Sequence, residues 1–165
     1  MLTNSNASSG GVSAGQGQAV LLCQVGLFVC ALPLEHVSET MRPLPLEPLS
    51  GTASFIAGVS IIRGGPVPVV DLARLLGNGT DELRTRLVVV RVGERRAALS
   101  VAGVIGVRSL ESAAVSELPP LLGGTSAEVI LAVGSLDARL LLLLETSRML
   151  PGFSWSSLEA GGAQA

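Results

Sequence analysis

The sequence predicts an all-β fold of two tandem five-stranded lobes with short helices and a shared apolar core. Short runs rich in Val, Ile and Leu recur between Gly, Pro and Asp residues, a spacing typical of sandwiches and barrels. Asp71 as an N-cap and Gly77 as a left-handed terminator predict one short helix, and a second is expected after Glu145. The expected strands are 19–25, 28–32, 56–62, 67–72, 86–92, 95–101, 103–108, 129–136 and 139–145.

An internal repeat is the second observation behind this fold class. Residues 25–37 superpose on 92–104, so that Val25-Gly26 recurs as Val92-Gly93. Residues 67–76 superpose in the same way on 141–150. Each copy then holds a hairpin, a third strand, a second hairpin and a short helix. Five strands with one apolar face close most economically into a small barrel, which removes exposed strand edges.

The repeat also predicts the domain organisation. We expect a first lobe at about 19–77 and a second at about 84–151, which together form one domain over 19–151. A half of about 65 residues is marginal alone, so the lobes are expected to share an apolar seam. The compositions of 1–18 and 152–165 predict a disordered tail before this domain and a flexible tail after it.

Composition excludes several classes of function. All 11 basic residues are Arg, and the absence of Lys excludes lysine Schiff-base enzymes and phosphate-loop ATPases. The net charge is −2 with the signs interspersed, so no nucleic-acid partner is expected. Mean hydropathy is +0.58, but Asp137 and Arg139 interrupt the most apolar stretch, so no direct membrane insertion is expected. The start of the chain lacks the features of a signal peptide, which predicts a cytoplasmic protein.

Few residues offer chemistry. His36 is the single histidine and has only Glu35 and Glu39 as acidic sequence neighbours, and Asp71 is best interpreted as a helix cap. Cys23 and Cys30 lie in one expected hairpin; buried free thiols are favoured over a disulfide, and their spacing does not suit a zinc site. The sequence therefore predicts no catalytic residue, no metal and no cofactor, and favours a protein that works by offering surfaces.

One segment resembles a known family. Residues 58–72 read Gly-Val-Ser-Ile-Ile-Arg-Gly-Gly-Pro-Val-Pro-Val-Val-Asp-Leu, which is similar to the Gly-Val-x-Asn-x-Arg-Gly-x-x-x-Pro-x-x-Asp-Leu signature of the CheW family. The resemblance implies two SH3-like β-barrel lobes. It also implies an adaptor, not an enzyme, that couples chemoreceptors (methyl-accepting chemotaxis proteins) to a CheA-type histidine kinase. Such adaptors hold the cytoplasmic helical hairpin of the receptor between their lobes, at membrane-associated chemoreceptor arrays in the cytoplasm.

The resemblance also implies site residues. Val37, Glu39 and Arg63 occupy expected receptor-binding positions, and Glu39 and Arg63 are expected to pair across adjacent strands as a desolvated ion pair. Gly58 and Gly64 are weaker candidates for the interface with kinase or receptor.

The sequence departs from the family signature at one position, where Ile61 replaces the Asn. This departure leaves open a specialised CheW-like scaffold for a partner other than the kinase. A small ligand-binding or hydrolytic barrel is a third hypothesis. It requires His36 and Asp71 to lie within hydrogen-bond reach of each other.

Overall fold

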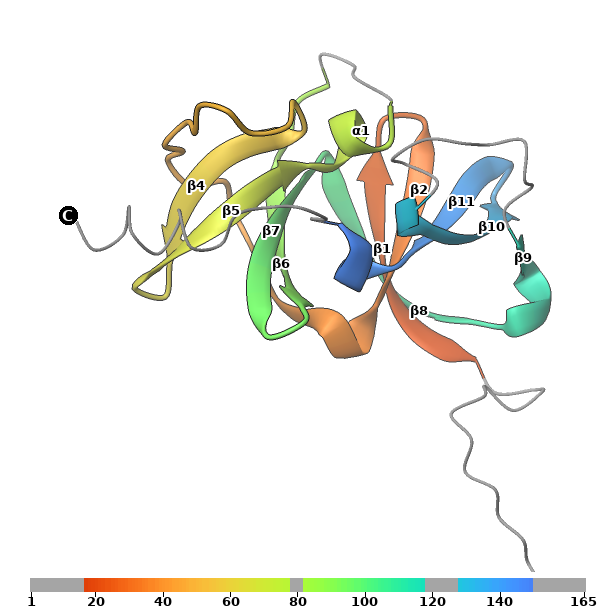
Figure 1. The fold of residues 1–165 in the computed structure, drawn as a ribbon. Coiled ribbons are helices and arrows are strands. Elements are labelled where there is room, and N and C mark those ends of the chain that lie inside the picture. Colours follow the sequence, from red (N-terminus) through yellow and green to blue (C-terminus); the bar gives the residue numbers. More distant parts are fainter. Residues whose placement is uncertain (1–16, 78–81, 118–127, 150–165) are drawn as a thin grey trace, which may run out of the picture.

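The computed structural model describes residues 17–77, 82–117 and 128–149, which form two β-sheets side by side (Figure 1). Apart from Gly17 and Gln18, the expected tails 1–18 and 152–165 lie outside the described residues. The six-stranded sheet has the order β8-β1-β2-β11-β10-β9, and the five-stranded sheet has the order β3-β6-β7-β5-β4. The strands are β1 (Gln18–Val25), β2 (Phe28–Pro33), β3 (Val37–Met41), β4 (Ile56–Ile62), β5 (Gly65–Asp71), β6 (Arg86–Val92), β7 (Arg95–Val101), β8 (Gly103–Leu110), β9 (Val115–Glu117), β10 (Ile130–Leu136) and β11 (Arg139–Leu144).

The internal repeat is confirmed by the hairpin turns. The β1–β2 and β6–β7 hairpins each turn on a glycine with positive φ, Gly26 at 57° and Gly93 at 64°. The β4–β5 and β10–β11 hairpins instead turn on two consecutive residues with positive φ, which is typical of type I′ turns. These pairs are Arg63-Gly64 and Asp137-Ala138, and they occupy equivalent positions in the two copies.

The strand registers repeat as well. β3 has a β-bulge against β6 between Val37 and Glu39, and the second copy has the same irregularity where β8 pairs with β1. The bulge between Ile56 and Gly58 on β4 recurs between Ile130 and Ala132 on β10. Residues of the paired hairpins and of β3 and β8 can therefore be compared with structural counterparts in the other copy.

The two sheets do not follow the expected division into 19–77 and 84–151. The six-stranded sheet takes the hairpin β1–β2 from the first half of the chain and β8, β9, β10 and β11 from the second. The five-stranded sheet takes β6–β7 from the second half and β3, β4 and β5 from the first. Two parallel pairings, β2 with β11 and β5 with β7, join these contributions. Each half of the chain thus completes the sheet begun by the other.

The lobes also depart from the expected pair of closed five-stranded barrels. One sheet has a sixth strand, β9, and the outermost strands of each sheet do not pair with each other within the described residues. Each sheet still encloses a small apolar cluster of its own, so the lobes remain SH3-like in outline. These clusters are Val20, Leu22, Val29, Ala31, Ala132, Leu141 and Leu143 in the six-stranded sheet, and Ile62, Val67, Val69, Leu87, Val89 and Ala98 in the five-stranded sheet.

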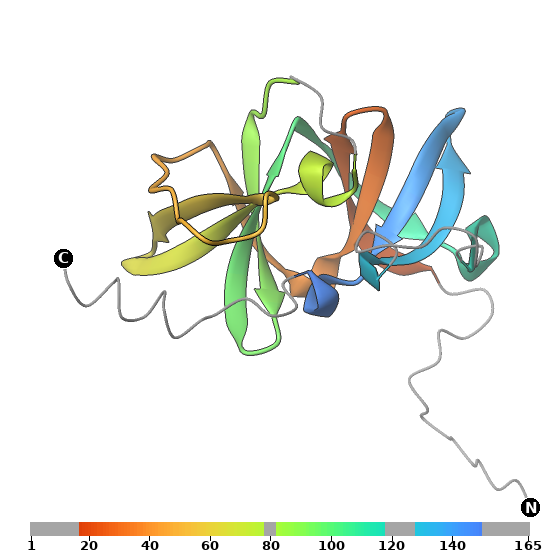
Figure 2. The same cartoon turned by 45° about the horizontal axis from the view of Figure 1, so that its top comes forward.

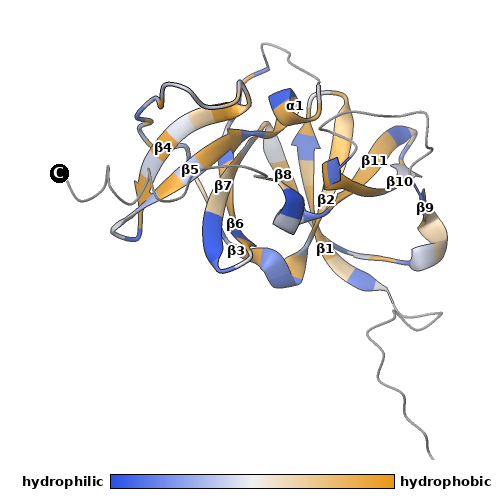
Figure 3. Cartoon of the chain, viewed as in Figure 1, coloured by the Kyte–Doolittle hydropathy of each residue, from blue (hydrophilic) through white to orange (hydrophobic). Residues whose placement is uncertain are grey.

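The expected shared core is confirmed. The largest buried cluster takes side chains from β1, β2, β5, β6, β7 and β11 together with α1 (Leu72–Leu75). Alternate residues of β11 pack into different apolar clusters. Leu142 and Leu144 belong to the shared cluster. Leu141 and Leu143 belong to the cluster of the six-stranded sheet. This explains why the strands are apolar on both faces (Figure 3).

Short helices lie between and beside the sheets (Figures 1 and 2). Asp71 caps α1, accepting a hydrogen bond from the Arg74 backbone at 3.3 Å, and Gly77 follows with a φ of 76°. In the second copy Glu145 caps η3 (Thr146–Arg148) in the same way. Two further 3-10 turns, η1 (Leu34–His36) and η2 (Ser112–Ala114), precede β3 and β9. These two strands were not among the expected apolar runs because their residues are largely polar or exposed.

Candidate functional site

A bidentate ion pair joins Glu39 on β3 to Arg63 in the β4–β5 turn. The Arg63 Nε donates to Glu39 Oε1 at 3.1 Å, and an Arg63 terminal nitrogen donates to Oε2 at 2.7 Å. The pairing is as expected, but the strands are not adjacent, because β3 and β4 lie at opposite edges of the five-stranded sheet. The ion pair therefore links the two edges of a curled sheet at the point where its strands do not pair.

The pair is exposed, which corrects the expectation of a desolvated one. The Arg63 side chain is 73% accessible and that of Glu39 is 24% accessible. The hydrogen bonds from Arg63 hold the pKa of the Glu39 carboxyl below its ordinary value, and the charges of Arg63 and Arg96 act in the same direction. The same contact raises the pKa of Arg63. An exposed pair of this kind adds little to stability, so its main physical effect is to orient the guanidinium.

The backbone at Arg63 supports a role for its side chain outside the fold. Arg63 has a φ of 53°, a left-handed conformation that Asn or Gly adopts at lower cost. In the other sheet the counterparts of Glu39 and Arg63 are Gly106 and Asp137, which cannot form an ion pair. Because the same hairpin and bulge form there without the ion pair, the fold does not require it.

The other expected site residues have roles within the chain. Val37 is partly buried and packs against the shared core. Gly58 has a φ of 151°, and a Cβ atom there would lie 2.6 Å from the Glu47 carbonyl oxygen, so the backbone that approaches it belongs to this chain. Gly64 completes the type I′ turn and has open space around it. Of these three residues, Gly64 is the one next to the ion pair.

Ile61 carries an apolar side chain two residues before Arg63 in the sequence. It is 63% exposed and lies opposite Pro66 on β5. Its neighbour Ser60 donates a hydrogen bond to the Pro45 carbonyl at 2.8 Å, so the segment around Pro45 runs along the outer edge of β4. Where the family signature has a polar Asn, this chain therefore has an exposed Ile on a strand that lies between the proline-containing strand β5 and the segment around Pro45.

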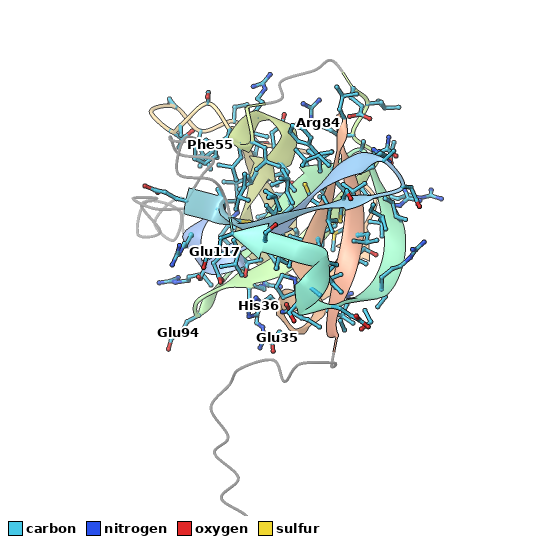
Figure 4. The ribbon with its side chains drawn as sticks, turned by 90° about the vertical axis from the view of Figure 1, so that its right-hand side faces the viewer. Glu35, His36, Phe55, Arg84, Glu94 and Glu117 are labelled. Atoms are coloured by element: carbon cyan, nitrogen blue, oxygen red, sulfur yellow. The ribbon has the colours of Figure 1, made fainter. Side chains whose placement is uncertain are left out.

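The hydrolytic hypothesis loses its geometric basis. Thr146 Oγ1 lies 3.0 Å from His36 Nδ1, whereas the Asp71 carboxylate pairs with Arg84 at 2.8 Å. Figure 4 shows His36 at the lower end of the molecule and Arg84 at the upper end. The structure therefore does not bring the histidine and the aspartate together.

Cys23 on β1 and Cys30 on β2 are cross-strand neighbours, and both are buried free cysteines. Burial raises the pKa of Cys23 to about 12 and raises that of Cys30 further. Among residues 17–77, 82–117 and 128–149, no three side chains of the metal-binding types gather into a possible site. Within the same residues, no helix has the length and apolar character needed to cross a membrane.

Sequence reasoning missed two arginines at the same end of the sheet as the ion pair. Arg91 on β6 and Arg96 on β7 are direct cross-strand neighbours. Arg96 donates to the Ile62 carbonyl at 3.3 Å, which places it beside the Arg63 turn. The repeat contained the signal that could have found them, since their counterparts in the first copy are the uncharged Gln24 and Val29.

Comparison with known families now adds to this geometry. The profile described as "CheW-like domain" matches residues 19–153. The chain belongs to the CheW-like domain family. The ion pair and its two neighbouring arginines thus lie in the five-stranded sheet of a CheW-like domain.

Named relatives share this CheW-like domain. Protein FrzA of Myxococcus xanthus is 39% identical over 136 residues, covering 76% of this chain and 84% of FrzA. Chemotaxis protein CheW of Klebsiella aerogenes is 28% identical over 137 residues, covering 81% of this chain and 82% of that protein. The crystal structure of scaffolding protein TtCheW from Thermoanaerobacter tengcongensis superposes with a TM-score of 0.71 at 19% identity, covering 83% of this chain and 96% of that one. The last comparison concerns the fold alone.

Proposed function

We propose that this chain is a non-enzymatic adaptor that couples chemoreceptors to a CheA-type histidine kinase in chemosensory signal transduction. The observation that carries the proposal is the exposed Glu39–Arg63 pair, which orients a guanidinium at the protein surface, whereas the equivalent positions of the other lobe hold Gly106 and Asp137. The family supports the same function, because its named relatives include chemotaxis proteins. Such an adaptor would act in the cytoplasm at membrane-associated receptor arrays.

Arg63 is the proposed receptor contact. Its guanidinium is held by one carboxylate and is otherwise largely open to solvent, so it can form a further charge-assisted hydrogen bond to a partner. The partner element is the cytoplasmic helical hairpin of the receptor. Glu39 acts here as a positioning residue, because it fixes the direction in which the guanidinium points.

A binding experiment with matched variants tests the proposal. The full chain is incubated with the purified cytoplasmic hairpin of a chemoreceptor from the same organism and, separately, with the kinase. Wild type is expected to bind both, and Arg63→Ala is expected to lose hairpin binding. Asp137→Ala is the control, because it removes a charge from the equivalent left-handed turn position of the other lobe. Equal hairpin binding by all three proteins would contradict the assignment of Arg63.

The exposed Ile61 favours a second candidate, a specialised CheW-like scaffold whose partner is not the kinase. An apolar residue at the signature position offers a contact different from that of Asn. Binding to the kinase distinguishes the two functions. A chain that binds a receptor hairpin but not the kinase is the specialised scaffold.

A further inference from the structure

Four charged side chains gather at one end of the five-stranded sheet. They are Glu39 and the arginine cluster, which we define as Arg63, Arg91 and Arg96. Strands β5 and β7 are parallel, so the β4–β5 and β6–β7 turns lie at the same end of the sheet, toward the lower side of Figure 1. Arg96 is close enough to Glu39 for its charge to lower the pKa of that carboxyl.

These side chains also lie on one face. Arg91 alternates with Val89 along β6, and Arg96 alternates with Ala98 along β7; Val89 and Ala98 both belong to the apolar cluster enclosed by this sheet. Glu39 lies opposite Val89 in the register. The side chains of Arg91, Arg96 and Glu39 therefore lie on the same face of the sheet as its apolar cluster, at the end where the hairpin turns are.

The arginine cluster is an arrangement that lowers the stability of the sheet. Arg91 and Arg96 are directly opposite each other on antiparallel strands, and like charges in this position are destabilising. Arg91 reaches the Glu35 backbone carbonyl at 2.5 Å, so one of its donors is satisfied without neutralising its charge. Arg63 binds the Glu39 carboxylate and Arg96 acts on it electrostatically, whereas Arg91 is held by a backbone carbonyl. The three guanidinium groups of the cluster therefore outnumber its one carboxylate.

The other lobe provides an internal control for this arrangement. There the positions of Arg63, Arg91 and Arg96 hold Asp137, Gln24 and Val29, and no basic residue is present among them. The same strands and turns form without them. A local charge conflict that the fold does not need is characteristic of a functional surface.

Neighbouring charges do not remove this excess. Glu94 lies in the β6–β7 turn next to Arg95, and Glu35 lies 3.6 Å from His36 Nε2 (Figure 4). With Arg95 counted as well, this end of the sheet carries four guanidinium groups and three carboxylates, so the guanidinium groups outnumber the carboxylates by one.

We propose that the arginine cluster binds carboxylate side chains of the receptor hairpin, with Arg91 and Arg96 as specificity-determining residues beside Arg63. The inference rests on the proposed function, because it names the receptor hairpin as the occupant. Charge complementarity supports it, since guanidinium groups bind carboxylates in a bidentate geometry. The hairpin segment that docks here carries acidic residues at the contact.

The test measures hairpin binding for neutral variants at two salt concentrations. The full chain is titrated with the purified receptor hairpin by fluorescence anisotropy. Arg91→Gln and Arg96→Gln are each expected to weaken binding about tenfold or more and to reduce its dependence on salt. Arg86→Gln is the matched control, because Arg86 lies on β6 at the opposite end of the strand and is exposed. It is expected to change binding by less than about twofold.

Stability and charge-conserving variants complete the test. Arg91→Gln places at this position the residue that the other lobe carries, so its midpoint of thermal unfolding is expected to equal or exceed that of wild type. Arg91→Lys keeps the charge but loses the bidentate geometry, so it is expected to bind more weakly than wild type and more tightly than Arg91→Gln. These results separate a contact with the partner from a structural role.

The outcomes distinguish the inference from the proposed function. Hairpin binding by Arg91→Gln and Arg96→Gln equal to wild type would overturn the inference while leaving the adaptor function intact. Loss of kinase binding with unchanged hairpin binding would also overturn it. If wild type itself does not bind the hairpin, the proposed function and the inference both fail.

Discussion

Replacing Gly58 by alanine would place a methyl group 2.6 Å from the carbonyl oxygen of Glu47. At this distance the backbone around Glu47 must move away from β4. The movement affects two hydrogen bonds, because Glu47 and Val59 exchange both backbone bonds at 2.8 Å. Gly58→Ala is therefore expected to detach the 45–49 segment from the edge of the five-stranded sheet.

The size of the effect follows from those two bonds. A backbone hydrogen bond contributes about 0.5–1.5 kcal/mol net, so losing both costs about 1–3 kcal/mol. In a domain of this size each kcal/mol shifts the melting temperature by about 4 °C, which gives a decrease of about 4–12 °C. The substitution also places alanine at a φ of 151°, which adds backbone strain.

Gly106 is the matched control, because it has the same φ of 151° but nothing within 4 Å of its missing Cβ. Gly106→Ala carries the same backbone strain and the same change in unfolded-state entropy. The difference between the two melting temperatures, measured by circular dichroism, isolates the contact with Glu47. Equal melting temperatures would refute this account. Lost hairpin binding by a Gly58→Ala protein of unchanged stability would instead show that Gly58 contacts the partner.

Four further predictions concern stability and reactivity. Ala138→Gly relieves a left-handed alanine with a φ of 63° and should stabilise the protein by about 0.5–1 kcal/mol in urea unfolding; destabilisation would contradict the turn assignment. Because the pKa of Glu39 is lowered in the folded state, its contribution to stability is present at neutral pH and is lost as pH falls below its ordinary value of 4.5. The stability difference between wild type and Glu39→Gln should therefore shrink in acid, and a difference that grows there would contradict the ion pair. Burial raises the pKa of Cys23 to about 12 and also raises that of Cys30, so both thiols should resist a thiol reagent at pH 8 until the protein unfolds. Rapid labelling of the native protein would contradict their burial. Separate fragments 1–79 and 80–165 should lack stable β-structure alone and gain it on mixing, whereas independent folding of either would contradict the exchanged sheets.

Much of the fold could be predicted from the sequence because it depends on local signals. The apolar runs locate nine of the strands, and the Val-Gly dipeptides at 25–26 and 92–93 mark equivalent turns. The repeat predicts which strands are equivalent. It cannot predict which copy each hairpin pairs with, because equivalent strands present nearly the same apolar edge. The exchange between halves therefore required three-dimensional information.

The candidate site was also predictable only where a local sequence signal marks it. The resemblance placed Glu39 and Arg63 together, and they do form an ion pair. The partners were assigned to adjacent strands, but the curl of the sheet brings its opposite edges together, and no local sequence signal encodes that curl. Arg91 and Arg96 were missed because a charged pair near a turn resembles an ordinary solvated surface until its counterparts in the other lobe are compared.

Kinase phosphorylation in a three-component reconstitution tests the adaptor function most directly. Membranes containing the receptor are combined with the CheA-type kinase, with and without this chain, and incorporation of phosphate into the kinase is followed over time. Phosphorylation that depends on the receptor only when the wild-type chain is present, and not when Arg63→Ala replaces it, is the predicted result. Kinase activity that responds equally to the receptor with and without the chain would contradict the account.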